Sequence, residues 1–159
     1  MRTRTIVAFG LALTVVTPVV AQTSDPRGAA RVTVGLVKKY LDEPADFAAG
    51  GAIRVNLPRR FGVEPEFLVS RGSRFNQWSF VPNVTFDLSG SRGRITPYVT
   101  GGVGYLHELD KSINYKRGDL TWNGGIGARL RLGGMLFAAP EFRLVDLAPR
   151  ISIGLGYEF

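Results

Sequence analysis

The carboxy-terminal residues RISIGLGYEF (150–159) alternate in character with a period of two. After the leading arginine, the odd positions are bulky: Ile151, Ile153, Leu155, Tyr157 and Phe159. The even positions are small or polar: Ser152, Gly154, Gly156 and Glu158. Successive side chains of a β-strand point to opposite faces of the sheet, so this stretch predicts a strand with one apolar and one polar face.

The same alternation recurs along the chain, and no stretch beyond the amino terminus repeats apolar residues with helical spacing. Within 121–132, Trp122, Ile126 and Leu130 share one face, whereas Asn123 and Arg129 share the other. Such segments predict eight strands, at residues 30–37, 50–57, 63–71, 78–88, 95–106, 121–132, 135–144 and 150–159. We expect a bulge where Pro82 and Pro140 interrupt them, because proline cannot donate to a ladder.

The distribution of charge between the two faces distinguishes two architectures. A water-soluble sheet protein buries its apolar face and exposes its polar one. The polar faces here are rich in charge and glycine, and the apolar faces form a nearly continuous band, which favours a barrel that is apolar outside and polar inside. In lipid the barrel must close, since each unpaired backbone group costs several kcal/mol. We therefore predict an all-β, eight-stranded antiparallel up-and-down transmembrane β-barrel over residues 30–159.

The amino terminus has the layout of a secretory signal peptide. Arg2 and Arg4 precede the apolar run IVAFGLALTVV (6–16), and small residues lead up to Ala21. This run of eleven is about half the roughly 20 residues that a transmembrane helix needs. We predict cleavage after Ala21, which leaves a short segment, 22–29, before the barrel.

The composition limits the classes of function. A chain of 159 residues suits one domain, and the absence of cysteine excludes disulfides and thiolate metal sites. Without the signal peptide, 18 basic and 13 acidic residues give a net charge of +5. For an exported protein this excess favours anionic lipid over nucleic acid as a partner. No motif indicates a cofactor.

Loop lengths and aromatic positions predict an orientation. Three connections are short and two are long: 58–62, 89–94 and 133–134 against 38–49 and 107–120. Short turns at one rim are typical of barrels with both termini in the periplasm. Trp78, Tyr105 and Trp122 would then lie at the outer membrane interface and Phe86 at the inner one, as two aromatic girdles.

Three segments resemble the outer-membrane β-barrel domain family of Gram-negative bacteria, the small OmpA/OmpX-like eight-stranded barrels: RITPYVTGGVGYLHEL (94–109), TWNGGIGARLRLGGMLFAAPEFRLVD (121–146) and RISIGLGYEF (150–159). The resemblance covers residues 31–159. It implies a location in the outer membrane. It also implies that Tyr157 and Phe159 form the signal that the outer-membrane assembly machinery reads.

The polar faces carry charges of both signs that a barrel would place in its lumen: Arg54, Glu64, Glu66, Asp87, Arg129, Arg131, Glu141, Arg143 and Glu158. An eight-stranded barrel is just wide enough for its side chains to fill. We therefore expect a self-satisfied polar plug rather than a gated ion path.

The chain's one histidine, His107, precedes Glu108 at the start of the predicted loop 107–120. Some eight-stranded barrels are lipid A deacylases with a His-x-Ser motif, but position 109 is leucine. We therefore predict a solvated loop histidine, no catalytic residues and no metal site. The glycine clusters 101–104 and 124–127 lead into no helix and are not expected to bind phosphate.

Basic residues of two predicted loops could form an outer rim that contacts lipopolysaccharide: Arg71, Arg74, Lys111, Lys116 and Arg117. Local pairing with Asp110 and Asp119 is the competing interpretation. The sequence thus predicts a monomeric outer-membrane protein with a structural or surface-interaction role and no catalysis. The alternatives are a narrow porin-like channel, a lipid A-modifying enzyme and a secreted soluble barrel that holds a ligand.

Overall fold

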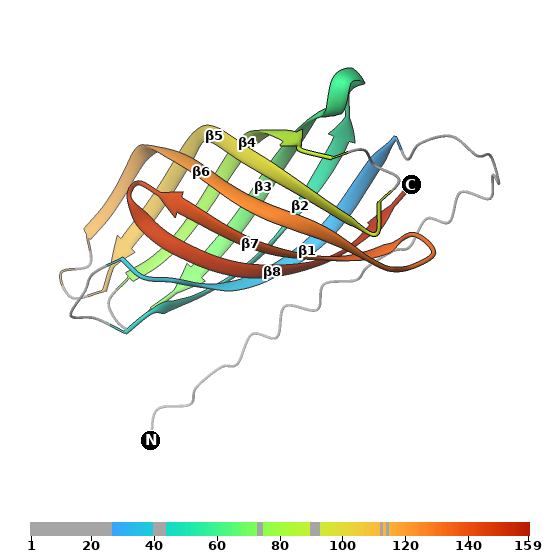
Figure 1. Cartoon of the computed structure of the whole chain (residues 1–159). Coiled ribbons are helices and arrows are strands. Elements are labelled where there is room, and N and C mark those ends of the chain that lie inside the picture. Colours follow the sequence, from blue (N-terminus) through green and yellow to red (C-terminus); the bar gives the residue numbers. More distant parts are fainter. Residues whose placement is uncertain (1–26, 40–43, 73–74, 90–92, 112, 114) are drawn as a thin grey trace.

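A computed structural model describes residues 27–39, 44–72, 75–89, 93–111, 113 and 115–159. Eight antiparallel strands form one closed barrel in chain order (Figure 1). The strands are β1 (Gly28–Val37), β2 (Asp46–Asn56), β3 (Phe61–Arg71), β4 (Phe75–Asp87), β5 (Ile95–Asp110), β6 (Tyr115–Gly133), β7 (Leu136–Val145) and β8 (Ala148–Glu158), with a short 3-10 helix η1 (Pro58–Arg60) between β2 and β3. In the described part of the chain, no helix is long and apolar enough to span a membrane. The predicted barrel fold is confirmed.

Strands β1 and β8 close the barrel. They pair from Ala29↔Glu158 to Val37↔Arg150, and Gly28 and Phe159 each donate a backbone N–H to the other's carbonyl at 2.9 Å. Both ends of the barrel chain therefore lie at one rim, which we call the terminal end. The opposite rim, with the β1–β2, β3–β4, β5–β6 and β7–β8 connections, is called the distal end.

The hairpin formed by β5 and β6 is longer than the sequence predicts. The predicted loop at 107–120 is wrong, because β5 continues to Asp110, β6 begins at Tyr115, and the two strands pair up to these residues. Polar residues occupy both faces of this part of the hairpin. The hydrophobic alternation that would predict a strand is therefore absent from this stretch of sequence, even though β5 and β6 are paired along all of it.

The barrel is apolar outside and polar inside. On β1, Val32 and Val34 expose 44% and 42% of their surface, whereas Arg31 and Thr33 expose 6% and 1%. The same inversion holds on β8, where Ile153 is exposed and its neighbour Ser152 is buried. In water such a surface would be a large contiguous apolar patch. The inversion is the arrangement that a hydrocarbon surround requires.

Pro82 is accommodated without a bulge. It lies opposite Pro65 of β3, and its pairing with β5 lapses before resuming at Asn83↔Gly102 in unchanged register. The missing N–H therefore affects the ladder on one side of the strand only, and no residue is inserted. The predicted bulge at this position is wrong.

Pro140 follows the same rule. It pairs with Ile153 of β8, while its pairing with β6 lapses and resumes in the same register. The irregularity between β6 and β7 falls instead at Arg131/Gly133, beside the turn. The bulge predicted at Pro140 is therefore also wrong.

Replacing Ile153 with arginine tests which face of β8 meets lipid. Ile153 lies mid-strand on the apolar face, so we expect a loss of about 2–4 kcal/mol in the free energy of unfolding from vesicles. Leu132→Arg, on the same face but next to the β6–β7 turn, should cost only about 0–1 kcal/mol. Urea titrations followed by tryptophan fluorescence measure both. Equal costs would contradict a lipid-facing band.

Candidate functional site

Charged side chains fill the lumen, because each occupies the inward position of its strand. The buried arginines are Arg31, Arg54, Arg129, Arg143 and Arg150. The carboxylates that they contact are Glu64, Glu66, Asp87 and Glu141. These groups separate into two clusters along the barrel axis.

The central cluster contains six residues from β1, β3, β7 and β8: Arg31, Glu64, Glu66, Glu141, Arg143 and Arg150. Arg31 Nη2 lies 2.6 Å from Glu64, and Arg143 Nη1 lies 3.0 Å from Glu66. Arg150 Nη2 lies 3.1 Å from the same Glu66 oxygen. Glu141 contacts all three arginines. Each carboxylate is thus shared, and the cluster joins strands that are distant in the chain.

Arg143 is the most deeply buried residue of the central cluster. It is 0% exposed, and its Nε lies 2.6 Å from Glu141. A side chain at Gly125 on the neighbouring β6 would place a Cβ only 2.5 Å from Arg143 Cγ. Gly125 therefore makes room for the Arg143 side chain in the lumen.

The terminal cluster contains Arg54 of β2, Asp87 of β4 and Arg129 of β6. Arg54 Nη2 donates to both Asp87 oxygens at 3.1 Å, and Arg129 Nη2 lies 2.5 Å from Asp87 Oδ2. Two guanidinium groups thus share one carboxylate. Arg54 also donates through Nε to Asn56 at 2.6 Å.

Tyr98 of β5 connects the two clusters. Its hydroxyl donates to Glu141 at 2.8 Å and accepts from Arg31 at 3.3 Å. Its ring lies 5.5 Å from the Arg129 guanidinium carbon, a cation–π contact. The lumen therefore contains one continuous polar network.

All nine predicted lumen charges lie on the inward register. Seven are in the two clusters, and Arg131 and Glu158 form a separate pair at the terminal end, 3.2 Å apart. Arg31, Arg150 and Tyr98 are not among the lumen residues predicted from the sequence. The alternation of each strand could have identified all three, because each lies two residues from an inward-facing neighbour. These neighbours are Thr33, Ser152 and Thr100, respectively.

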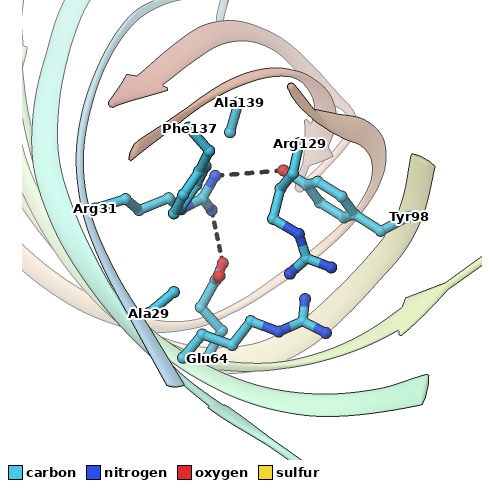
Figure 2. Close-up of a pocket in the computed structure, with 8 residues that line it drawn as sticks. Ala29, Arg31, Glu64, Tyr98, Arg129, Phe137 and Ala139 are labelled. Carbon is cyan, nitrogen blue, oxygen red and sulfur yellow. Dashed lines mark hydrogen bonds and ion pairs between the residues drawn. The ribbon is translucent and has the colours of Figure 1, made fainter. Parts of the chain in front are cut away.

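The network leaves little free space. A cavity of about 10 Å³ lies between the two clusters (Figure 2), and a second of about 40 Å³ lies toward the distal end. One water molecule needs about 10–15 Å³. These spaces therefore suit one and a few water molecules, respectively.

The predicted girdle aromatics lie on the outward register near both rims. The Trp78 ring centre is 5.6 Å from those of Tyr105 and His107, toward the distal end. Trp122 is exposed at the same end, beside Asp146. At the terminal end, Phe86 packs on Phe61 with ring centres 4.9 Å apart. A girdle role for these aromatics stays a prediction.

His107 is a strand residue, which corrects the prediction of a solvated loop histidine. It pairs with Gly118 in the β5–β6 ladder and stacks on Trp78 on the outward face. Glu108 points the opposite way, where its carboxylate accepts from Lys39 and Gln77. These two residues therefore do not form a catalytic pair with each other. Among the described residues, no three His, Asp or Glu side chains are grouped to hold a metal.

The basic rim residues do not form one cluster. Lys111 donates to the Gly72 carbonyl at 2.6 Å, which places it beside Arg71. Lys116 and Arg117 are adjacent in β6 and so point to opposite faces, and Arg117 pairs with Asp119. Arg74 lies outside the described residues, as does the predicted signal peptide.

No protein-family model matches the chain, and no curated protein matches it in sequence. Solved structures do match. The amino-terminal β-barrel domain of Pseudomonas aeruginosa OprF superposes with a TM-score of 0.70 at 13% identity, covering 84% of this chain and 98% of that domain. Neisserial surface protein A gives 0.65 at 9% identity, covering 83% and 96%. A de novo designed transmembrane β-barrel gives 0.59 at 17% identity, covering 86% and 98%.

These comparisons establish the fold. The chain has the architecture of the small eight-stranded outer-membrane barrels, so the family resemblance seen in the sequence is confirmed at the level of fold. Because a designed barrel shares this fold, the architecture alone does not determine what the protein does.

Arg143→Gln tests the importance of the central cluster. Removing this charge leaves Glu66 and Glu141 under-compensated in a buried site, and we expect a loss of about 3–5 kcal/mol in the free energy of unfolding. The matched control is Arg117→Gln, whose pair with Asp119 is 66% and 44% exposed in its side chains. The control should lose less than about 1 kcal/mol. If Arg143→Gln lost as little free energy of unfolding as this control, the buried charge of Arg143 would add no stability.

Proposed function

We propose that this protein is an integral outer-membrane barrel with a structural or surface-interaction role rather than a catalytic or conductive one. The observation that carries the proposal is the pairing of an apolar outer wall with a lumen filled by its own charged side chains. The apolar wall fits lipid, and the filled lumen opposes free diffusion of solutes. The predicted signal peptide provides the route of export.

The distal hairpin supports a surface-interaction role. β6 pairs with β7 only from Asn123 onward, whereas it pairs with β5 as far as Tyr115. The last backbone contact of β6 on this side is between Trp122 and Asp146. The Asp146 N–H donates to the Trp122 carbonyl, and the Asp146 carboxylate accepts from the Trp122 N–H. Beyond that point, β6 has a backbone partner on one side only among the described residues.

This free edge suits the addition of a strand from another polypeptide. The Trp122 N–H and C=O face Asp146, so by strand alternation the same groups of Lys116, Gly118 and Leu120 face away from β5. A row of such groups is a template for an extended peptide. An outward location of the distal end would present this edge to the cell exterior.

Lipopolysaccharide and the assembly machinery are the proposed partners of the two rims. Arg71 and Lys111, adjacent at the distal end, would contact lipid phosphates, with Lys116 as a separate contribution. At the terminal end, Tyr157 and Phe159 are exposed on the outward register. They would offer the carboxy-terminal signal to the assembly machinery.

The chain contains no cysteine, so single introduced cysteines report its topology without background. We expect Lys116→Cys to react with a membrane-impermeant maleimide on intact cells, because the distal hairpin projects outward. Met135→Cys, in the β6–β7 turn at the terminal end, should react only after the outer membrane is permeabilised. The reverse pattern would contradict the orientation, and reaction of both in the extracellular medium would indicate a secreted protein.

Recordings in planar lipid bilayers separate the proposal from the porin-like alternative. The folded wild-type barrel should give no steady single-channel conductance in about 1 M KCl, because the two cavities described among the lumen side chains are only large enough for water molecules. A known open porin in the same bilayers is the positive control. Reproducible unitary steps from the wild-type protein would favour a channel function.

A further inference from the structure

We propose that the cavity beside the terminal cluster is a binding site for one small monatomic anion of the chloride class. The cavity is lined by three arginines, one glutamate and one tyrosine, together with three apolar side chains. Figure 2 shows the Arg129 guanidinium extending into the space below the Arg31–Tyr98 bond and to the right of the Arg31–Glu64 bond.

The first reason is a local excess of positive charge. Glu64 compensates Arg31 at 2.6 Å, but Arg54 and Arg129 share the single carboxylate of Asp87. All three members of this terminal cluster are buried. A buried charge without a partner is costly. Among the described residues, one further carboxylate, that of Asp110, is buried outside the network, and it lies at the distal end of β5, away from the terminal cluster.

The second reason is a surplus of hydrogen-bond donors. A guanidinium carries five N–H donors and no acceptor. Among the described residues, Arg129 contacts one carboxylate, through Nη2, and the ring of Tyr98. Arg31 Nε is buried without a hydrogen-bond partner among the described residues. An acceptor that carries negative charge would satisfy both the excess donors and the excess charge.

The third reason is size. The free volume of about 10 Å³ admits a single water-sized particle. Polyatomic anions such as phosphate or sulfate do not fit without displacing side chains. The apolar walls, Phe137, Ala29 and Ala139, offer no hydrogen bonds, so the ligand would be held by the arginines.

Anion-dependent stability tests the site. A ligand that binds only the folded state raises the folding equilibrium constant by a factor of 1 + [L]/Kd. Refolded wild-type barrel is titrated with urea in chloride or in gluconate at equal ionic strength. Its folding equilibrium constant should be about 11-fold larger in chloride when the chloride concentration is about ten times its Kd. Gluconate is too large for the cavity and serves as the non-binding reference.

Two variants with the same change in charge make the test specific. Arg129→Gln leaves Arg54 and Asp87 as a balanced pair, so the chloride increment should disappear. Arg131→Gln removes an arginine that does not line the cavity, and the increment should remain. Equal wild-type stability in both salts, or an increment that survives Arg129→Gln, would overturn the proposal.

Bromide soaked into wild-type crystals gives an independent result that does not depend on the folding of any variant. An anomalous peak between Arg54, Arg129 and Arg31 would support the site. Peaks confined to the protein surface, representing an adventitious ion only, would overturn it.

Discussion

The hydrogen bonding of the backbone in an apolar surround is the constraint on which the rest of the structure depends. Hydrocarbon offers no partner to an unpaired N–H or C=O, so the sheet must close on itself. β1 and β8 achieve this closure along nearly their whole length, including the reciprocal bonds of Gly28 and Phe159. The part of β6 that extends past its pairing with β7 is the stretch that precedes Trp122, and it lies at the distal end.

Closure with eight strands determines what the interior can contain. A cylinder of this size encloses side chains and little else, and most of the buried inward positions in the described part of the chain are polar or charged. Charged groups in that space must compensate one another, because water is scarce. Arginines from β1, β7 and β8 therefore meet glutamates of β3 across the barrel, and the small space left between the two clusters is a candidate for binding.

The sequence predicts the barrel body well because lipid and lumen impose opposite chemistry on alternate residues. The stretch Ile151–Leu155 illustrates this, since its parity alone places Ile153 outside and Ser152 inside. The distal half of the β5–β6 hairpin could not be found in this way, because both of its faces are polar. Parity also could not reveal which charges pair, so the sharing of Asp87 by Arg54 and Arg129 required the folded geometry.

The most direct test of the account is the solvent that surrounds each residue of β8. Nitroxide labels at single cysteines from Ile151 to Leu155, in vesicle-reconstituted protein, can be probed with oxygen, which concentrates in lipid, and with a water-soluble paramagnetic reagent. We predict strong oxygen collisions at Ile151, Ile153 and Leu155 and weak collisions with both reagents at Ser152 and Gly154. Strong collisions with the water-soluble reagent at the three apolar positions would contradict a membrane-embedded barrel.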